Sequence, residues 1–226
     1  MQTIGENLER VQQEIAAACA KVGRNVDDIA LVAVTKTHSA DKVREAVAAG
    51  QVVFGESKVQ EARAKIPLLP SHLRWHFIGH LQKNKIRHAL PLFELIHSVD
   101  SVDLAAQIDR IAREDGFFPR ILLEINIAGE GSKFGFKPQM LEQSIEQLLE
   151  LPRLSIEGLM AIPPLAGDSE KSRPHFARLR SFRDDLEEKF DVKLPQLSMG
   201  MSDDVAVAIE EGATMVRVGT RIFGPR

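Results

Sequence analysis

The chain has a single cysteine, Cys19, among its 226 residues, so no intramolecular disulfide can form. A lack of disulfides is typical of a reducing compartment, and we expect a cytoplasmic protein. Cys19 follows Ile15 by four residues, on the apolar stripe of a helix expected over residues 6–22. This spacing predicts a thiol that packs in the core.

Tyrosine is absent, although the chain has 11 phenylalanines and one tryptophan, so no mechanism that needs a phenol can operate. No uncharged apolar run reaches the roughly 18 residues of a membrane-spanning helix. The first residues lack the basic-then-apolar order of a signal peptide. The net charge of −3 leaves no excess of cations to hold a phosphate backbone. We therefore expect neither membrane association nor a nucleic-acid partner.

Short apolar runs rich in β-branched residues alternate with amphipathic stretches along most of the chain. Eight runs predict strands, at 29–35, 52–55, 75–79, 95–99, 120–126, 155–160, 196–200 and 214–219. Seven stretches between them predict helices, at 41–49, 57–66, 82–90, 104–114, 138–151, 171–190 and 203–211.

Apolar runs without alternation indicate strands buried on both faces, as in parallel sheets. Eight β–α units in this length favour a closed (β/α)8 TIM barrel, an α/β fold. A doubly wound open sheet is the alternative. We predict a single domain over residues 1–226, with a helix at 6–22 and the barrel at about 29–224.

Lys36 ends the first predicted strand, after six largely apolar residues. Active residues of such barrels lie at the C-terminal ends of the strands. The amine of Lys36 would reach the barrel mouth while its stem stays among apolar side chains. Partial desolvation and nearby cations would lower its pKa, as a Schiff-base lysine requires. A lysine that only extends to solvent is the alternative.

A second candidate site lies at the ends of the last two strands. Ser202 precedes two aspartates and an apolar-periodic stretch, which predicts that it caps the helix at 203–211. Gly219 and Thr220 follow the eighth strand, where we expect a tight turn with open backbone N–H groups and one hydroxyl. Barrels often bind phosphate with the loops after strands seven and eight. The alternative is simply a capped helix followed by a turn.

Other patterns are weaker. The segment 129–135 resembles a phosphate loop but lacks the Gly-Lys-Ser/Thr order of a Walker motif. His76 and His80 are four residues apart but lie on a strand and its exit, without a clustered cysteine or carboxylate, so we expect no metal site. Glu130 and Lys133 follow the fifth strand and join the residues expected at the mouth.

Seven blocks resemble, in order, the pyridoxal phosphate homeostasis protein family of the YggS/PROSC type. They are LVAVTK (31–36), VVFGESKVQEA (52–62), WHFIGHLQKNK (75–85), HSVDS (97–101), the spaced Asn-Glu-Lys-Gly pattern of 126–135, GLMAIPP (158–164) and the stretch 197–224 from LSMGMSDD to RIFG. The resemblance covers nearly the whole chain. One departure is the pair Ser57-Lys58, where many members have Asn-Tyr.

The resemblance implies a barrel like the N-terminal domain of alanine racemase, with pyridoxal 5'-phosphate (PLP) as the cofactor. It implies that Lys36 forms a Schiff base with PLP and that Arg217 faces the pyridine ring. The other cofactor-binding residues that it implies are Ser198, Ser202, Gly219 and Thr220, and we add His80, at the exit of the third strand, as a further candidate. The implied function is intracellular PLP (vitamin B6) homeostasis, as a carrier or regulator of PLP. We expect a monomer, with PLP-dependent apo-enzymes as partners.

The residues themselves favour a carrier without catalytic residues. Arg217 has only hydrogen-bond donors, so it would leave the pyridine nitrogen unprotonated and the ring a weak electron sink. No tyrosine is available as the second base of a racemase. The alternatives are a weak PLP-dependent racemase-like enzyme that uses His80 or another group as second base, and a Schiff-base aldolase on a sugar phosphate.

Overall fold

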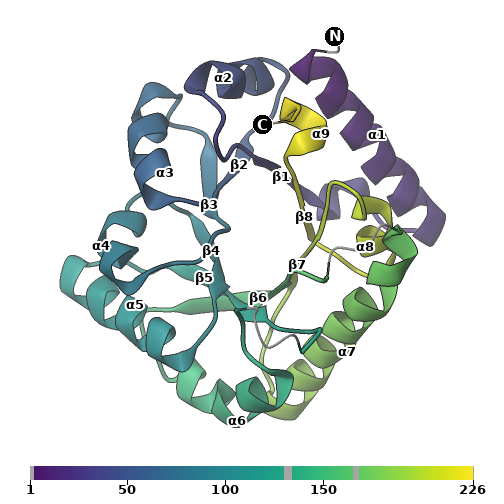
Figure 1. Ribbon diagram of the computed structural model, residues 1–226. Coiled ribbons are helices and arrows are strands. Elements are labelled where there is room, and N and C mark those ends of the chain that lie inside the picture. Colours follow the sequence, from purple (N-terminus) through teal and green to yellow (C-terminus); the bar gives the residue numbers. More distant parts are fainter. Residues whose placement is uncertain (1–2, 130–133, 165–167, 226) are drawn as a thin grey trace.

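The computed structural model describes residues 3–129, 134–164 and 168–225. Its eight strands form a closed parallel barrel in the order of the sequence (Figure 1). They are β1 (Ala30–Val34), β2 (Val53–Glu56), β3 (Arg74–Phe77), β4 (Leu95–Val99), β5 (Arg120–Ile125), β6 (Ser155–Ala161), β7 (Gln196–Met201) and β8 (Met215–Val218). Ala33 pairs with Phe54 of β2 on one side and Val218 of β8 on the other. This closure confirms the predicted barrel and excludes the open sheet.

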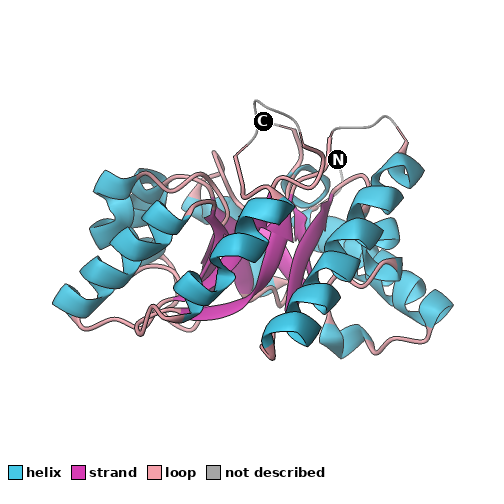
Figure 2. Cartoon of the chain, turned by 90° about the horizontal axis from the view of Figure 1, so that it is seen from below, coloured by secondary structure: helices cyan, strands magenta, loops and turns pink. Residues whose placement is uncertain are grey.

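Helices surround the strands, as the side view shows (Figure 2). They are α1 (Ile4–Val22), α2 (Ala40–Ala48), α3 (Val59–Lys65), α4 (Ile86–Ala89), α5 (Val102–Asp115), α6 (Pro138–Leu149), α7 (Arg173–Phe190), α8 (Val205–Glu210) and α9 (Thr220–Phe223). Short 3₁₀ helices lie at Val26–Asp28, Ile66–Leu68, Lys83–Lys85 and Ser169–Ser172. A capping box formed by Thr3 and Glu6 starts α1, and Gly23 ends it in the left-handed region.

Three local predictions were wrong. The helix expected over 82–90 is a 3₁₀ turn followed by the single turn α4, and no side chain caps either one. Ser202 does not cap α8, because Asp204 occupies the cap position and its carboxylate accepts the N–H of Met201 at 2.7 Å. The turn expected at Gly219 and Thr220 is the start of an extra helix, α9.

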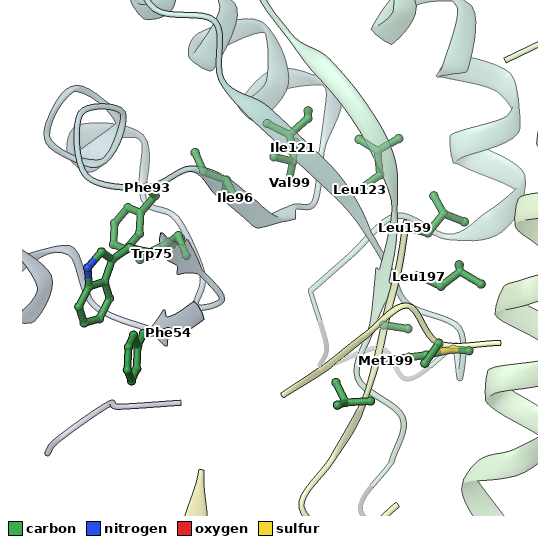
Figure 3. Close-up of a cluster of buried hydrophobic side chains, with 14 of the residues drawn as sticks. Phe54, Trp75, Phe93, Ile96, Val99, Ile121, Leu123, Leu159, Leu197 and Met199 are labelled. Carbon is green, nitrogen blue, oxygen red and sulfur yellow. The ribbon is translucent and has the colours of Figure 1, made fainter. Parts of the chain in front are cut away.

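The main core lies between the strands and the helix ring. Side chains that point outward from the strands pack there, among them Phe54, Trp75, Leu123 and Leu159 (Figure 3). Burying one such side chain stabilises the fold by about 1.5–3 kcal/mol. Cys19 is 1% exposed within this core, which confirms its predicted packing.

The barrel interior is layered, apolar at the floor and polar toward the mouth. Leu95, Leu122, Met160 and Met215 form the floor as a separate buried cluster. Successive residues of a strand face opposite sides, so the residue two positions further along points into the barrel again. On β4, β5 and β8 these next residues are His97, Glu124 and Arg217, all buried. The polar layer therefore lies between the apolar floor and the open mouth.

Candidate functional site

A pocket of about 390 Å³ opens at the mouth, at the C-terminal ends of β1, β7 and β8. Its lining includes five residues that the sequence predicts for cofactor binding: Lys36, Ser202, Arg217, Gly219 and Thr220. The closure of β8 on β1 brings together residues from the two ends of the chain. In Figure 1 the short helix α9 lies between α1 and α2, on the side of the barrel formed by β1 and β8.

Lys36 lies two residues beyond the end of β1 and is half-buried. It occupies a tight turn, in which the N–H of His38 donates to the carbonyl of Thr35 at 3.0 Å. Val34 lines the same pocket, since residues two apart on an extended strand share a face. The strand thus directs the lysine into the mouth, as predicted.

Gly219 brings the backbone that follows β8 close to the end of β1. A Cβ added there would lie 3.3 Å from both the Cβ and the carbonyl oxygen of Val34. Thr220 begins α9 and is exposed, and the first N–H groups of a helix have no partner within that helix. Ser202 is held nearby, because Arg221 donates to its carbonyl at 2.9 Å. These three residues offer hydroxyls and backbone donors suited to an anion.

Arg217 is the buried cation beneath the pocket. Its guanidinium donates to Ser198 Oγ at 2.5 Å and to the carbonyl of Ala161 at 3.0 Å. Burial lowers the pKa of Arg217 to about 10, while the carboxylates of Glu124 and Asp204 oppose that effect. Arg217 is therefore still charged at neutral pH. Ser198 is not among the lining residues of the pocket, so its contact with the site runs through Arg217.

A chain of buried hydrogen bonds continues from Arg217 toward the barrel floor. Ser198 Oγ lies 2.9 Å from Nδ1 of His97, and Nε2 of His97 lies 3.0 Å from Nδ1 of His76. Arginine only donates, so Ser198 accepts from Arg217 and its own hydrogen can go to His97. His97 then carries its proton on Nε2 and donates to His76. In the described part of the chain, Nε2 of His76 is a buried atom without a partner.

Burial keeps both histidines neutral. Desolvation lowers the pKa of His76 to about 4, and it lowers that of His97 well below the ordinary range, with His76 and Arg217 adding to the effect. The pKa of Glu124 shifts in the opposite direction. Burial and the charge of Asp100 raise it to about 7, although the positive charge of Arg217 acts to lower it.

Sequence reasoning missed this interior cluster of His76, His97 and Glu124. It considered His76 only as a metal ligand, and within the described residues no three His, Cys, Asp or Glu side chains could hold a metal ion. The available signal was spacing, because His97, Glu124 and Arg217 each follow an apolar floor residue by two positions.

His80 lies outside the mouth pocket, in a neighbouring pocket that shares Ser57 with it. Its Nδ1 is 3.2 Å from a carboxylate oxygen of Asp100, and its ring stacks on Phe134 with centroids 4.0 Å apart. The side chain is 41% exposed. The structure therefore does not bring His80 together with Lys36. Glu130, Lys133 and most of the segment 129–135 lie outside the described residues.

The fold and site define a class, the barrel domain found at the N-terminus of alanine racemases. The family model "Alanine racemase, N-terminal domain" matches residues 7–226. The alanine racemase of Clostridium difficile has the same fold, with a TM-score of 0.76 at 18% identity over 95% of this chain and 56% of that one.

None of the helices described in the structure is long and apolar enough to cross a membrane.

Within that class, the chain belongs to the pyridoxal phosphate homeostasis protein family. It is 43% identical to the Aquifex aeolicus member, over 98% of this chain and 97% of that protein. It is 40% identical to the Escherichia coli K12 member, over 100% and 98% of the two chains. The structure of PipY from Synechococcus elongatus with PLP bound has a TM-score of 0.82 at 42% identity, over 93% and 100%.

Proposed function

We propose that this protein binds PLP in the mouth pocket, holds it through Lys36 as a Schiff base, and acts in PLP homeostasis as a carrier. One observation carries the proposal. Lys36, Ser202, Arg217, Gly219 and Thr220 come from opposite ends of the chain and line one pocket. The relative PipY, solved with PLP, is 42% identical.

These residues fit the chemistry of the cofactor. The amine of Lys36 would attack the aldehyde carbon of PLP, forming a C=N bond while the carbonyl oxygen leaves as water. Ser202, Thr220 and the backbone at Gly219 would hold the phosphate, which carries about −1.5 to −2 charges near neutral pH. Lys36 and Arg217 supply positive charge to the same pocket. PLP supplies an electron-withdrawing ring when it is bound.

Arg217 supports a carrier over an enzyme. Its pKa of about 10 keeps it a donor at neutral pH, so it cannot protonate the pyridine nitrogen efficiently. The ring is then a weak electron sink. His80, the second base of the racemase alternative, lies in the neighbouring pocket. His38 lines the mouth pocket instead and is the histidine that a racemase-like activity could use there.

The visible spectrum of the purified protein tests the binding proposal. We expect a yellow protein in which borohydride fixes PLP to the peptide that contains Lys36. Lys36→Ala should lose the Schiff-base absorbance, whereas Lys171→Ala, at an exposed lysine far along the chain, should keep it. An unchanged spectrum in Lys36→Ala would assign the Schiff base to another lysine.

The carrier role is tested by transfer. Loaded protein incubated with a PLP-dependent apo-enzyme should activate it, while a panel of amino acids shows no turnover by the loaded protein alone. We expect the protein to run as a monomer in this assay. Robust racemase turnover without transfer, abolished by His38→Ala, would replace the carrier proposal with the enzyme alternative.

A further inference from the structure

The turn that carries Lys36 is held in a conformation that its sequence does not favour. Thr37, the residue after Lys36, has a φ of 68°. Thr37 occupies the third position of the turn closed by Thr35 and His38, where glycine or asparagine is usual when φ is positive. A β-branched residue in this region is strained, and such strain persists only where the surroundings fix it.

Helix α3 supplies those surroundings with two side chains. Glu61 accepts the backbone N–H of Thr37 at 3.0 Å. Lys65, one helical turn further along α3, donates to the carbonyl of Thr35 at 2.8 Å. Residues four apart lie on the same face of a helix. One face of α3 therefore holds the backbone on both sides of Lys36, and Figure 1 shows α3 beside β2 and β3.

The contact with Thr35 is part of a buried ionic cluster. Lys65 pairs with Glu56 Oε1 in a short contact, and the two side chains are 8% and 0% exposed. The same Glu56 oxygen accepts the hydroxyl of Thr35 at 2.6 Å. Removing one member of a buried pair leaves an uncompensated charge and strongly destabilises a protein. The Lys65–Glu56 pair thus anchors the base of the turn.

Glu61, the second side chain that holds the turn, is more exposed than Lys65 and Glu56. Its side chain is 28% exposed and lies 3.2 Å from the amine of Lys58. The hydrogen bond from Thr37 is the main reason that the pKa of Glu61 lies below its ordinary value, with Lys58 and Lys65 adding to the effect. The carboxylate is therefore ionised at neutral pH and accepts strongly from the strained residue.

We propose that Glu61 and Lys65 are positioning residues, which hold the strained turn at Thr37 so that the amine of Lys36 points into the mouth pocket. Neither is proposed to touch the cofactor. The inference rests on the proposed role of Lys36. It adds that α3, outside the pocket, determines how well Lys36 serves that role.

The test uses Glu61, because a Lys65 variant risks misfolding. The variants are Glu61→Ala, the conservative Glu61→Gln, and Arg63→Ala, at an exposed position of the same helix, as the matched control. Two readouts are measured on the full chain. The first is the pH dependence of Lys36 acylation in the cofactor-free protein, followed by mass spectrometry. The second is the dissociation constant for PLP.

We expect Glu61→Ala to weaken PLP binding about tenfold, the loss of one hydrogen bond to a charged group. The pH profile of Lys36 acylation should shift as well. Glu61→Gln, which keeps an acceptor, should recover most of both effects, and Arg63→Ala should change neither. If Glu61→Ala matches Arg63→Ala in both readouts, the proposal is wrong.

Thr37→Gly tests the mechanism directly, because glycine adopts positive φ without strain. In that background Glu61→Ala should weaken PLP binding by no more than about threefold, since the turn no longer needs support. An equal loss in both backgrounds would show that Glu61 acts by another route and would overturn the inference. The acylation readout needs no cofactor, so it remains informative even if Lys36→Ala shows that another lysine forms the Schiff base.

Discussion

Glu124→Gln should change how stability depends on pH, because burial in the barrel interior favours the neutral form of this carboxyl. Its pKa rises from the ordinary 4.5 to about 7, mainly through burial. The folded state therefore binds more protons than the unfolded state between these values, and stability falls as pH rises through that window. At about 1.4 kcal/mol for each tenfold change in proton affinity, the full effect is about 3 kcal/mol.

The buried histidines act with the opposite sign. The folded pKa of His76 is about 4, below its ordinary 6.5, and that of His97 is also lowered. Their contribution to stability is present above about 6.5 and is lost as pH falls. In the wild-type protein this trend opposes that of Glu124 over an overlapping pH range. A pH profile of the wild type alone therefore says little, and the difference between wild type and variant is the informative quantity.

Urea unfolding of the cofactor-free chain at a series of pH values from 4.5 to 7.5 measures that difference. Near pH 4.5 Glu124 is protonated in the folded state and about half protonated in the unfolded state, so Glu124→Gln should be close to neutral. Near pH 7 and above, the variant should have gained up to about 3 kcal/mol relative to wild type. Glu146→Gln, at an exposed site on α6, serves as the control and should stay parallel to wild type. If the stability of Glu124→Gln runs parallel to that of wild type across this pH range, the pKa of Glu124 is not raised in the folded state.

Three further outcomes follow from the site. Thr220→Ala should weaken PLP retention about ten- to a hundredfold with the fold intact, because hydrogen bonds to charged groups contribute about 1.5–3 kcal/mol. Gly219→Val should weaken PLP retention more, since a Cβ at this position already lies 3.3 Å from Val34. If both variants bind PLP as tightly as wild type, the phosphate binds elsewhere. Ser198→Ala should lower thermal stability and raise the dissociation constant of PLP, because Arg217 loses a buried acceptor. Calorimetry and PLP titration measure the two effects. If neither value changes, Ser198 has no role in holding Arg217.

The strands were predictable because buried parallel strands leave an unbroken apolar signature in the sequence. All eight predicted runs became strands, and the end of β1 located Lys36 correctly in the mouth. The eight repeated β–α units also predicted a closed barrel, in which Val218 pairs with Ala33. The mouth residues Gly219 and Thr220 followed from the same logic, since they come next after β8.

Errors arose where a local rule competed with a tertiary contact. Ser202 and Asp204 are both good cap residues, and the contact of Asp204 with the N–H of Met201 decides between them. The strained Thr37 gives no sequence signal, because threonine is unfavourable there and the contacts of Glu61 and Lys65 that hold the turn come from α3. The interior hydrogen bonds of His97 depend on which strands become neighbours across the barrel, and periodicity cannot specify that.

The position of the site at the β1–β8 seam links cofactor binding to the integrity of the barrel. β1 and β8 are the first and last strands, and their pairing from Ala30 to Ala33 closes the sheet. Lys36 extends from one side of this seam and Thr220 from the other, so the pocket between them exists only when the barrel is closed. A ligand that binds only the folded state stabilises it by RT ln(1 + L/Kd), where L is the free ligand concentration and Kd the dissociation constant. PLP held by residues on both sides of the seam would therefore stabilise the pairing of the first and last strands.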